Sequence, residues 1–197
     1  MNRKLKAGYE RFRQGYLKEN REQLQAMAEV QQPSCIMITC CDARLDPGLI
    51  FDTEPGELFV IRNVANLVPP CEDQGTYHGT SAALEFAVTV LEVPNIVVLG
   101  HSRCGGIRAL VAGQDRMQPA SFIDRWMSIA APVRELARPE EVDDEAVMHR
   151  CEKAAVGHSL GNLMTYSWIA ERVEAGSLVL HGMHYDIYSG SLEEVSQ

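Results

Sequence analysis

Three short apolar runs most constrain what this chain of 197 residues can fold into. Residues 35–39 (CIMIT), 57–61 (ELFVI) and 95–100 (NIVVLG) have the length and composition of buried β-strands. Residues 79–93 show helical periodicity, and Gly105-Gly106 begins a further helical segment. Strands that alternate with helices predict an α/β fold with a mainly parallel central β-sheet, covered by helices on both faces.

The two ends of the chain are expected to form different elements: a helical arm at the N-terminus and a further strand at the C-terminus. Residues 4–28 are polar with a thin apolar stripe, which predicts an extended N-terminal helical arm that packs on a partner surface. Two further helical stretches are expected near residues 120–137 and 142–175. Residues 177–190 indicate a strand pair with a turn, and so a C-terminal antiparallel strand.

Charge and composition exclude several classes of protein. The formal net charge of −9 offers no basic surplus for binding nucleic acid, and no apolar run is long enough to span a membrane. The N-terminus lacks the apolar segment of a secretory signal. Six cysteines are too few for a disulfide scaffold of this length, so we expect reduced thiols and a cytoplasmic location. In that setting clustered cysteines indicate metal binding or catalysis.

The segment GHSRCGG at residues 100–106 permits two kinds of chemistry. A serine hydrolase would raise Ser102 on a strained turn flanked by glycines, but Cys104 stands where the second glycine is needed. Acidic residues and histidines follow downstream, so their order alone does not exclude this interpretation. The alternative takes His101 and Cys104 as a pair of metal ligands.

A second strand end favours the metal site. The strand at residues 35–39 leads directly into Cys40 and Cys41. Because the carboxyl ends of neighbouring parallel strands lie side by side, Cys40 can converge with His101 and Cys104. Two thiolates and one imidazole suit tetrahedral zinc, and three protein ligands leave a fourth position open, as in catalytic zinc sites.

Several motifs resemble the β-class carbonic anhydrases. They are CCDAR at 40–44, RNVAN at 62–66 and the long segment 85–106 (EFAVTVLEVPNIVVLGHSRCGG). Residues 151–166 and 178–195 are similar to the plant-type branch, and the resemblance extends from about Gln31 to Glu194. The first motif departs from the usual C-S-D-S-R at Cys41 and Ala43.

The resemblance implies reversible hydration of carbon dioxide to bicarbonate and a proton. Cys40, His101 and Cys104 would bind one Zn²⁺ per chain, with water or hydroxide as the fourth ligand. Arg44 would pair with Asp42 and keep it ionised, so that Asp42 orients the hydroxide toward carbon dioxide. In closed members of the family the aspartate binds zinc instead. Two thiolates would leave the water less acidic than three histidines do, so we expect activity to rise into alkaline pH.

The family also implies a substrate pocket and an assembly. Phe86 stands where plant-type enzymes usually carry tyrosine, and His184 is a candidate for assisting proton transfer. Residues 1–30 would form a dimer contact and 31–197 the zinc-binding catalytic domain, in a homodimer or a dimer-based oligomer. The pocket would be lined by Gln31, Phe59, Val64, Phe86 and the backbone N–H of Gly105.

Two alternatives remain open beside this interpretation. The same scaffold can hydrolyse carbon disulfide or carbonyl sulfide where access to zinc differs. A non-catalytic zinc-binding regulatory protein can also keep the fold, but it would be expected to lose part of the ligand set or of the Asp–Arg pair. Both are kept here.

Overall fold

The computed structural model describes residues 2–72, 78–113 and 121–196, which form two compact units. The first unit, residues 1–32, contains three short helices rather than the single predicted helix. They are α1 (Arg3–Gln14), α2 (Tyr16–Glu19) and α3 (Arg21–Glu29). The breaks fall at Gly15 and Asn20, two residues that are weak helix formers and common at helix ends. None of the residues in the three helices is buried.

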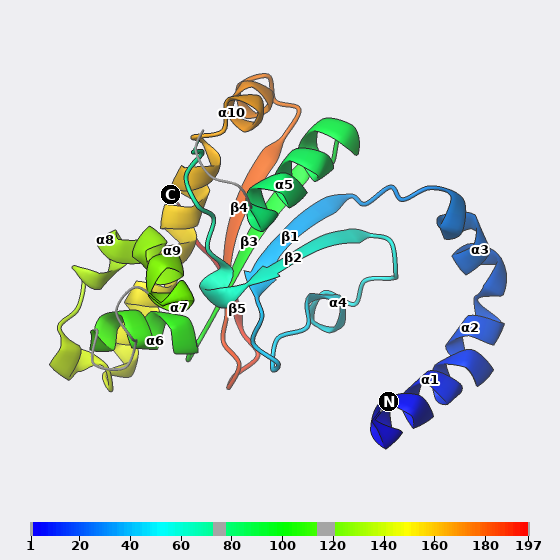
Figure 1. The fold of residues 1–197 in the computed structure, drawn as a ribbon, viewed down its shortest axis with the longest axis horizontal. Helices are drawn as coiled ribbons and strands as arrows, with labels where there is room; N and C mark the ends of the chain where they lie inside the picture. Colours follow the sequence, from blue (N-terminus) through cyan, green and yellow to red (C-terminus); the bar gives the residue numbers. More distant parts are fainter. Residues whose placement is uncertain (1, 73–77, 114–120, 197) are drawn as a thin grey trace. The chain divides into compact units, whose positions relative to one another are not determined.

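The second unit, residues 33–197, is built on one five-stranded sheet (Figure 1). The strand order is β2-β1-β3-β4-β5, and every pair is parallel except β4 with β5. The strands are β1 (Cys35–Cys40), β2 (Leu58–Asn63), β3 (Asn95–His101), β4 (Val179–Tyr185) and β5 (Leu192–Glu194). The predicted mainly parallel sheet with a C-terminal antiparallel strand is therefore confirmed, although β5 begins beyond the stretch predicted for the strand pair.

Helices cover the sheet along two hydrophobic clusters. Ile36, Ile38 and Val98 face one cluster, whereas Met37 and Leu99 face the other, as the alternation of side chains along a strand requires. The helices α6, α7 and α8 lie together in Figure 1 and contribute to the second cluster. The helical segments are α4 (Pro47–Ile50), η1 (Val64–Asn66), α5 (Gly79–Glu85), η2 (Phe86–Val90), α6 (Gly105–Ala112), α7 (Phe122–Met127), η4 (Ser128–Ala130), α8 (Ala131–Arg134), η5 (Pro139–Glu141), α9 (Glu145–Leu163) and α10 (Ser167–Glu174).

The helix predicted at residues 79–93 changes its winding part of the way along. Its α-helical part ends at Glu85, and one π-helical turn, η2, follows from Phe86 to Val90. In this turn the Leu91 N–H donates to the carbonyl of Phe86, five residues earlier. Such turns often occur at functional sites, and Phe86 is one of the predicted pocket residues.

Two glycines let α9 approach the sheet closely. A Cβ added at Gly100 on β3 would stand 2.5 Å from Val156 Cγ2, and one at Gly182 on β4 would stand 2.8 Å from Leu160 Cδ1. Both distances are shorter than carbon atoms tolerate, so α9 rests on the backbone of these strands. This contact brings the first half of α9 beside the carboxyl ends of β3 and β4.

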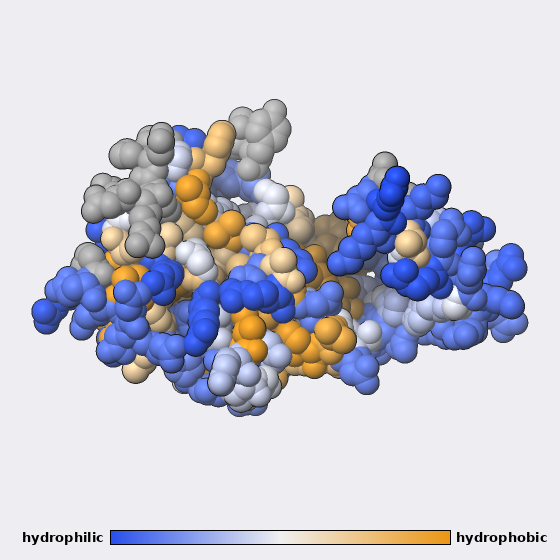
Figure 2. Space-filling view, turned by 90° about the horizontal axis from the view of Figure 1, so that it is seen from below, coloured by the Kyte–Doolittle hydropathy of each residue, from blue (hydrophilic) through white to orange (hydrophobic). Residues whose placement is uncertain are grey.

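Part of the apolar surface remains exposed. Figure 2 shows hydrophobic residues that reach the surface between hydrophilic ones. In the second unit the exposed large apolar side chains include Leu49, Val60, Phe86 and Val90. Among the helices of the described residues, none is both long and apolar enough to cross a membrane.

Candidate metal centre

The predicted metal ligands meet where two neighbouring strands end. Cys40 is the last residue of β1 and His101 the last residue of β3, while Cys104 directly precedes α6. Because β1 and β3 pair in parallel, their carboxyl ends lie side by side. The ligand atoms of the three residues lie within 4.8 Å of one another, and the residues are only 5%, 1% and 2% exposed, respectively. The convergence predicted from the strand ends is therefore confirmed.

The His101 ring has one nitrogen free for a metal. Nδ1 lies 2.9 Å from the carbonyl oxygen of Ser102, which can only accept, so Nδ1 carries the proton. Nε2 is buried and has no hydrogen-bond partner in the part of the chain that the structure describes. A histidine that donates one ring N–H to a backbone carbonyl and leaves the other nitrogen open is typical of a metal ligand. This orphaned nitrogen and two thiols fit zinc.

The two cysteines are electrostatically linked. The hydrogen bond between the Cys40 and Cys104 thiols lowers the pKa of Cys40 and raises the pKa of Cys104. The backbone N–H of Ala65 also points at Cys40 Sγ, at 3.4 Å. Ala65 has φ +63°, a left-handed conformation that costs energy for a residue with a side chain. Strained backbone thus helps to present a donor to a metal-ligating sulfur.

Asp42 and Arg44 form a bidentate ion pair immediately after β1. Arg44 Nε lies 2.9 Å from Asp42 Oδ1, and Arg44 Nη2 lies 2.7 Å from Oδ2. The Arg44 backbone N–H donates to Asp42 Oδ1 as well. These hydrogen bonds, the one from the Arg44 side chain above all, hold the pKa of Asp42 well below its usual value. Arg44 Nη2 also donates to the carbonyl of Arg103, so it links the two loops that carry the cysteines.

Arg62 holds this loop in place, a role that was not predicted from the sequence. Its guanidinium donates to the carbonyls of Cys40 at 3.0 Å, Asp42 at 2.8 Å and Leu45 at 2.6 Å. Arg62 can do so because β2 pairs with β1 in a register that sets it opposite Thr39. A signal was present, since Arg62 opens the RNVAN motif, but its partners are backbone atoms that a sequence does not identify.

The predicted substrate residues occupy different places. The rings of Phe59 on β2 and Phe86 on η2 lie 6.3 Å apart between centroids. Val64 begins η1, and its carbonyl accepts from the Trp126 indole at 2.8 Å. Gly105 is the first residue of α6. Gln31 is exposed and belongs to the first unit.

The structure gives no support to a serine nucleophile. Ser102 is buried, and its hydroxyl accepts a hydrogen bond from the Ile187 backbone N–H at 2.9 Å. This hydrogen bond ties the loop after β3 to the turn after β4. Ser102 is therefore a structural residue. Cys41, next to the ligand Cys40, is exposed.

Comparisons with known proteins agree with this geometry. The sequence model of the carbonic anhydrase family matches residues 35–192. From Arabidopsis thaliana, β carbonic anhydrase 3 is 37% identical over 96% of this chain and 75% of that protein. The mitochondrial β carbonic anhydrase 6 is 43% identical over 92% of this chain, and the chloroplastic β carbonic anhydrase 5 is 42% identical over 88%. The chain spans only 63% and 58% of the lengths of these last two relatives.

Solved structures show the same fold. The β-carbonic anhydrase CcaA is similar with a TM-score of 0.88 and 32% identity, over 98% of this chain and 94% of that one. A tetrameric β-carbonic anhydrase from Sordaria macrospora gives a TM-score of 0.83 and 26% identity, over 97% and 94% of the two chains.

The relatives correct the cytoplasmic location expected from the sequence. Two of them are named mitochondrial and chloroplastic, which points away from a purely cytoplasmic assignment. The expectation was wrong because it rested on reduced thiols and on the lack of a secretory signal. Neither feature separates the cytosol from the interior of an organelle.

Proposed function

Because this chain belongs to the β-class carbonic anhydrases, in the plant-type branch, we propose that it hydrates carbon dioxide reversibly to bicarbonate and a proton. Zinc is the metal of this family, and Cys40, His101 and Cys104 would hold one ion per chain. The observation that carries the proposal is the convergence of these three buried ligands beside an intact Asp42–Arg44 pair. A non-catalytic zinc protein would have no need to keep that ion pair.

The Asp42–Arg44 pair supplies the orientation that the reaction needs. Zinc, when bound, lowers the pKa of a water molecule so that a nucleophile forms near neutral pH. Because Arg44 keeps Asp42 ionised, the carboxylate can only accept hydrogen bonds. Asp42 would accept the remaining proton of the nucleophile and thereby turn a lone pair toward carbon dioxide. Arg44 and Arg62 would hold Asp42 in place, one through its carboxylate and the other through its carbonyl.

We propose that carbon dioxide and bicarbonate bind in a pocket lined by the predicted substrate residues of the second unit. Carbon dioxide is small and apolar, so it suits the paired rings of Phe59 and Phe86 and the side chain of Val64. The Gly105 N–H at the start of α6 would donate to an oxygen of the bicarbonate that forms. Phe86 lacks the hydroxyl that tyrosine would offer to the product.

Stopped-flow measurement of carbon dioxide hydration tests the proposed function, on protein whose zinc content has been quantified. We expect rapid turnover with one zinc per chain and a rate that rises from mildly acidic to alkaline pH. The rise is expected because two thiolates reduce the acidifying effect of zinc relative to three histidines, for which the water pKa is ~7. A flat pH profile would contradict this account of the ligand set. Turnover of carbon disulfide without carbon dioxide hydration would contradict the proposed substrate.

The first unit is proposed to be a dimer contact. On α1 the side chains of Leu5, Tyr9 and Phe12 are exposed at spacings that place them on one helical face. Large exposed apolar stripes mark interaction surfaces, and a second copy of the chain is the partner that the family implies. Light scattering of the full chain should give a mass of at least two chains. Replacement of Tyr9 and Phe12 by glutamate should lower that mass, and a wild-type monomer would contradict the proposal.

A further inference from the structure

Glu152 places a carboxylate behind the loop that carries Cys104. This residue lies on α9 and is only 3% exposed. Its Oε1 accepts a hydrogen bond from the Cys104 backbone N–H at 3.0 Å, and its Oε2 lies 3.2 Å from His184 Nε2. A carboxylate is rarely buried to this degree unless its hydrogen bonds compensate, because ionised groups lose much solvation energy. Both of its oxygens are accordingly engaged.

His184 lies on the far side of the Glu152 carboxylate from Cys104 and contacts it through Nε2. His184 is completely buried, and its Nδ1 has no hydrogen-bond partner within the described residues. A neutral ring with the proton on Nε2 donates to Glu152 and leaves only an unpaired acceptor at Nδ1. The contact between His184 Nε2 and Glu152 Oε2 thus ties the carboxylate to β4.

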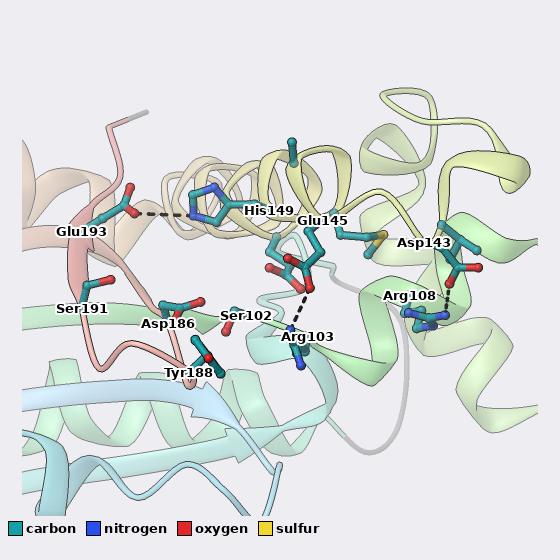
Figure 3. Close-up of a pocket in the computed structure, with 14 residues that line it drawn as sticks. Ser102, Arg103, Arg108, Asp143, Glu145, His149, Asp186, Tyr188, Ser191 and Glu193 are labelled. Carbon is teal, nitrogen blue, oxygen red and sulfur yellow. Dashed lines mark hydrogen bonds and ion pairs between the residues drawn. The ribbon is translucent and has the colours of Figure 1, made fainter.

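The arginines on the cavity side of Glu152 do not neutralise its charge. A cavity of about 850 Å³ reaches Glu152 from the surface, and Figure 3 shows its lining. The two lining arginines, Arg103 and Arg108, pair with Glu145 and Asp143 on the same walls. His149 Nε2 lies 3.6 Å from Glu193 Oε1, also in the lining. Both arginines of the lining are thus engaged by other carboxylates.

The loop that carries Cys104 contains strained backbone, and a hydrogen bond from outside the loop helps to hold it. Arg103, directly before Cys104, has φ +58°, a conformation that is strained for a residue with a side chain. The hydrogen bond from the Cys104 N–H to Glu152 fixes the peptide group between these two residues. Fixing that peptide also fixes the direction in which the Cys104 side chain leaves the backbone.

We propose that Glu152 is a positioning residue of the zinc site, which orients Cys104 through its backbone N–H and adds a buried negative charge that strengthens zinc binding. His184 holds the Glu152 carboxylate in the orientation that reaches the loop. The inference rests on the proposed zinc site but not on the identity of the substrate. Partners behind metal ligands commonly change metal affinity by about 10–100-fold.

Zinc affinity of the Glu152→Gln variant tests the inference. Glutamine keeps the shape and an acceptor oxygen but removes the charge, so we expect the Kd for zinc to rise about 10-fold or more, measured by competition with a chromophoric chelator. In protein loaded with cobalt(II), the thiolate-to-metal charge-transfer band should move to higher energy, because less negative charge acts on the sulfur. Ser159→Ala is the matched control, since Ser159 is a buried polar residue of the same helix that bonds Asn66 and Val68 instead.

Two results with the variants would overturn the inference. One is a zinc Kd and a cobalt band that are the same in Glu152→Gln as in wild type, and the other is an equal change in Ser159→Ala. The wild-type protein offers a measurement that does not depend on a variant folding: the Cys104 amide proton should resonate far downfield in NMR spectra, as a donor to a carboxylate does. An ordinary shift for this proton would also contradict the inference. Zinc binding that weakens in Glu152→Gln supports the inference even where carbon dioxide hydration is absent, so the two proposals can fail separately.

Discussion

Replacement of Cys40 by serine is expected to remove bound zinc and carbon dioxide hydration together. Cys40 contributes one of three buried ligand atoms, and a serine hydroxyl is a much poorer zinc ligand than a thiolate. Loss of a direct ligand should weaken zinc binding by more than the roughly 10–100-fold expected for an outer partner. Zinc content after dialysis and the stopped-flow rate of hydration measure both effects on the same preparation.

Cys35→Ser is the control for this experiment. Cys35 lies at the other end of β1 and receives the same chemical change, but it is far from the strand end that carries the ligands. Burial raises the pKa of Cys35 to about 11, so its thiol stays protonated at neutral pH. This variant should keep its zinc and its activity. Retention of full zinc by Cys40→Ser would refute the assigned ligand set.

Replacement of Asp42 by asparagine should separate orientation of the nucleophile from metal binding. Asparagine has nearly the same shape as aspartate but no charge. Its NH2 group cannot accept the hydrogen bond that Arg44 donates to the Asp42 carboxylate. We expect zinc content to remain at one per chain while kcat/KM for hydration falls about 100-fold, the loss typical of a misplaced reacting group. Combined zinc analysis and stopped-flow kinetics measure the two quantities.

The pH dependence of this variant provides an additional check. The side-chain hydrogen bond from Arg44 holds the pKa of Asp42 below its usual value, so the carboxylate is ionised throughout the range near neutrality. Its contribution to stability is present above the unfolded pKa of ~3.9 and is lost as the pH falls through the lower folded pKa. Asp42 therefore does not cause the rise of activity between mildly acidic and alkaline pH, and Asp42→Asn should keep the same profile at a lower rate.

Asp46→Asn serves as the matched control for Asp42→Asn. Asp46 lies in the same loop, where its side chain caps α4 by accepting from the Leu49 N–H at 3.2 Å. Asparagine caps helices as well as aspartate does, so this variant should retain both zinc and rate. A comparable loss of kcat/KM in both variants would show that the loop, rather than the Asp42 carboxylate, is responsible.

The metal centre could be predicted from sequence because it depends on a general property of parallel sheets. Cys40 and His101 each follow a short apolar run, and the ends of neighbouring parallel strands are close whatever their separation along the chain. The Asp42–Arg44 pair could be predicted because its two residues lie two positions apart in the same loop. These parts of the site follow from local order and strand topology.

The boundaries of several elements could not be predicted in this way. The helical pattern over residues 4–28 continues across Gly15 and Asn20, although both residues interrupt the helix in the structure. The pattern at 79–93 likewise gives no sign that a π-helical turn replaces the α-helix at Phe86. Hydrophobic periodicity reports which face is buried, whereas these changes depend on local hydrogen bonds.

Glu152 was missed for a different reason. It lies four residues after Met148 and four before Val156, so it falls on the buried face of α9. A charged residue on an apolar face was a usable signal. Its two partners, however, are a backbone N–H and a histidine on another element, which only the packing of α9 on Gly100 and Gly182 brings within reach.

The pairing of β1 with β3 has a consequence for how the protein is made. A hydrogen bond between Thr39 and Leu99 joins positions that are 60 residues apart in sequence, and the ligand set bridges the same two strands. A ribosome must therefore release both strands before any metal can be held by all three residues. From that moment the ion acts as a removable cross-link across the middle of the sheet, and it favours the folded chain over the unfolded one by mass action. Zinc would therefore contribute to the stability of the sheet as well as to the chemistry at its edge.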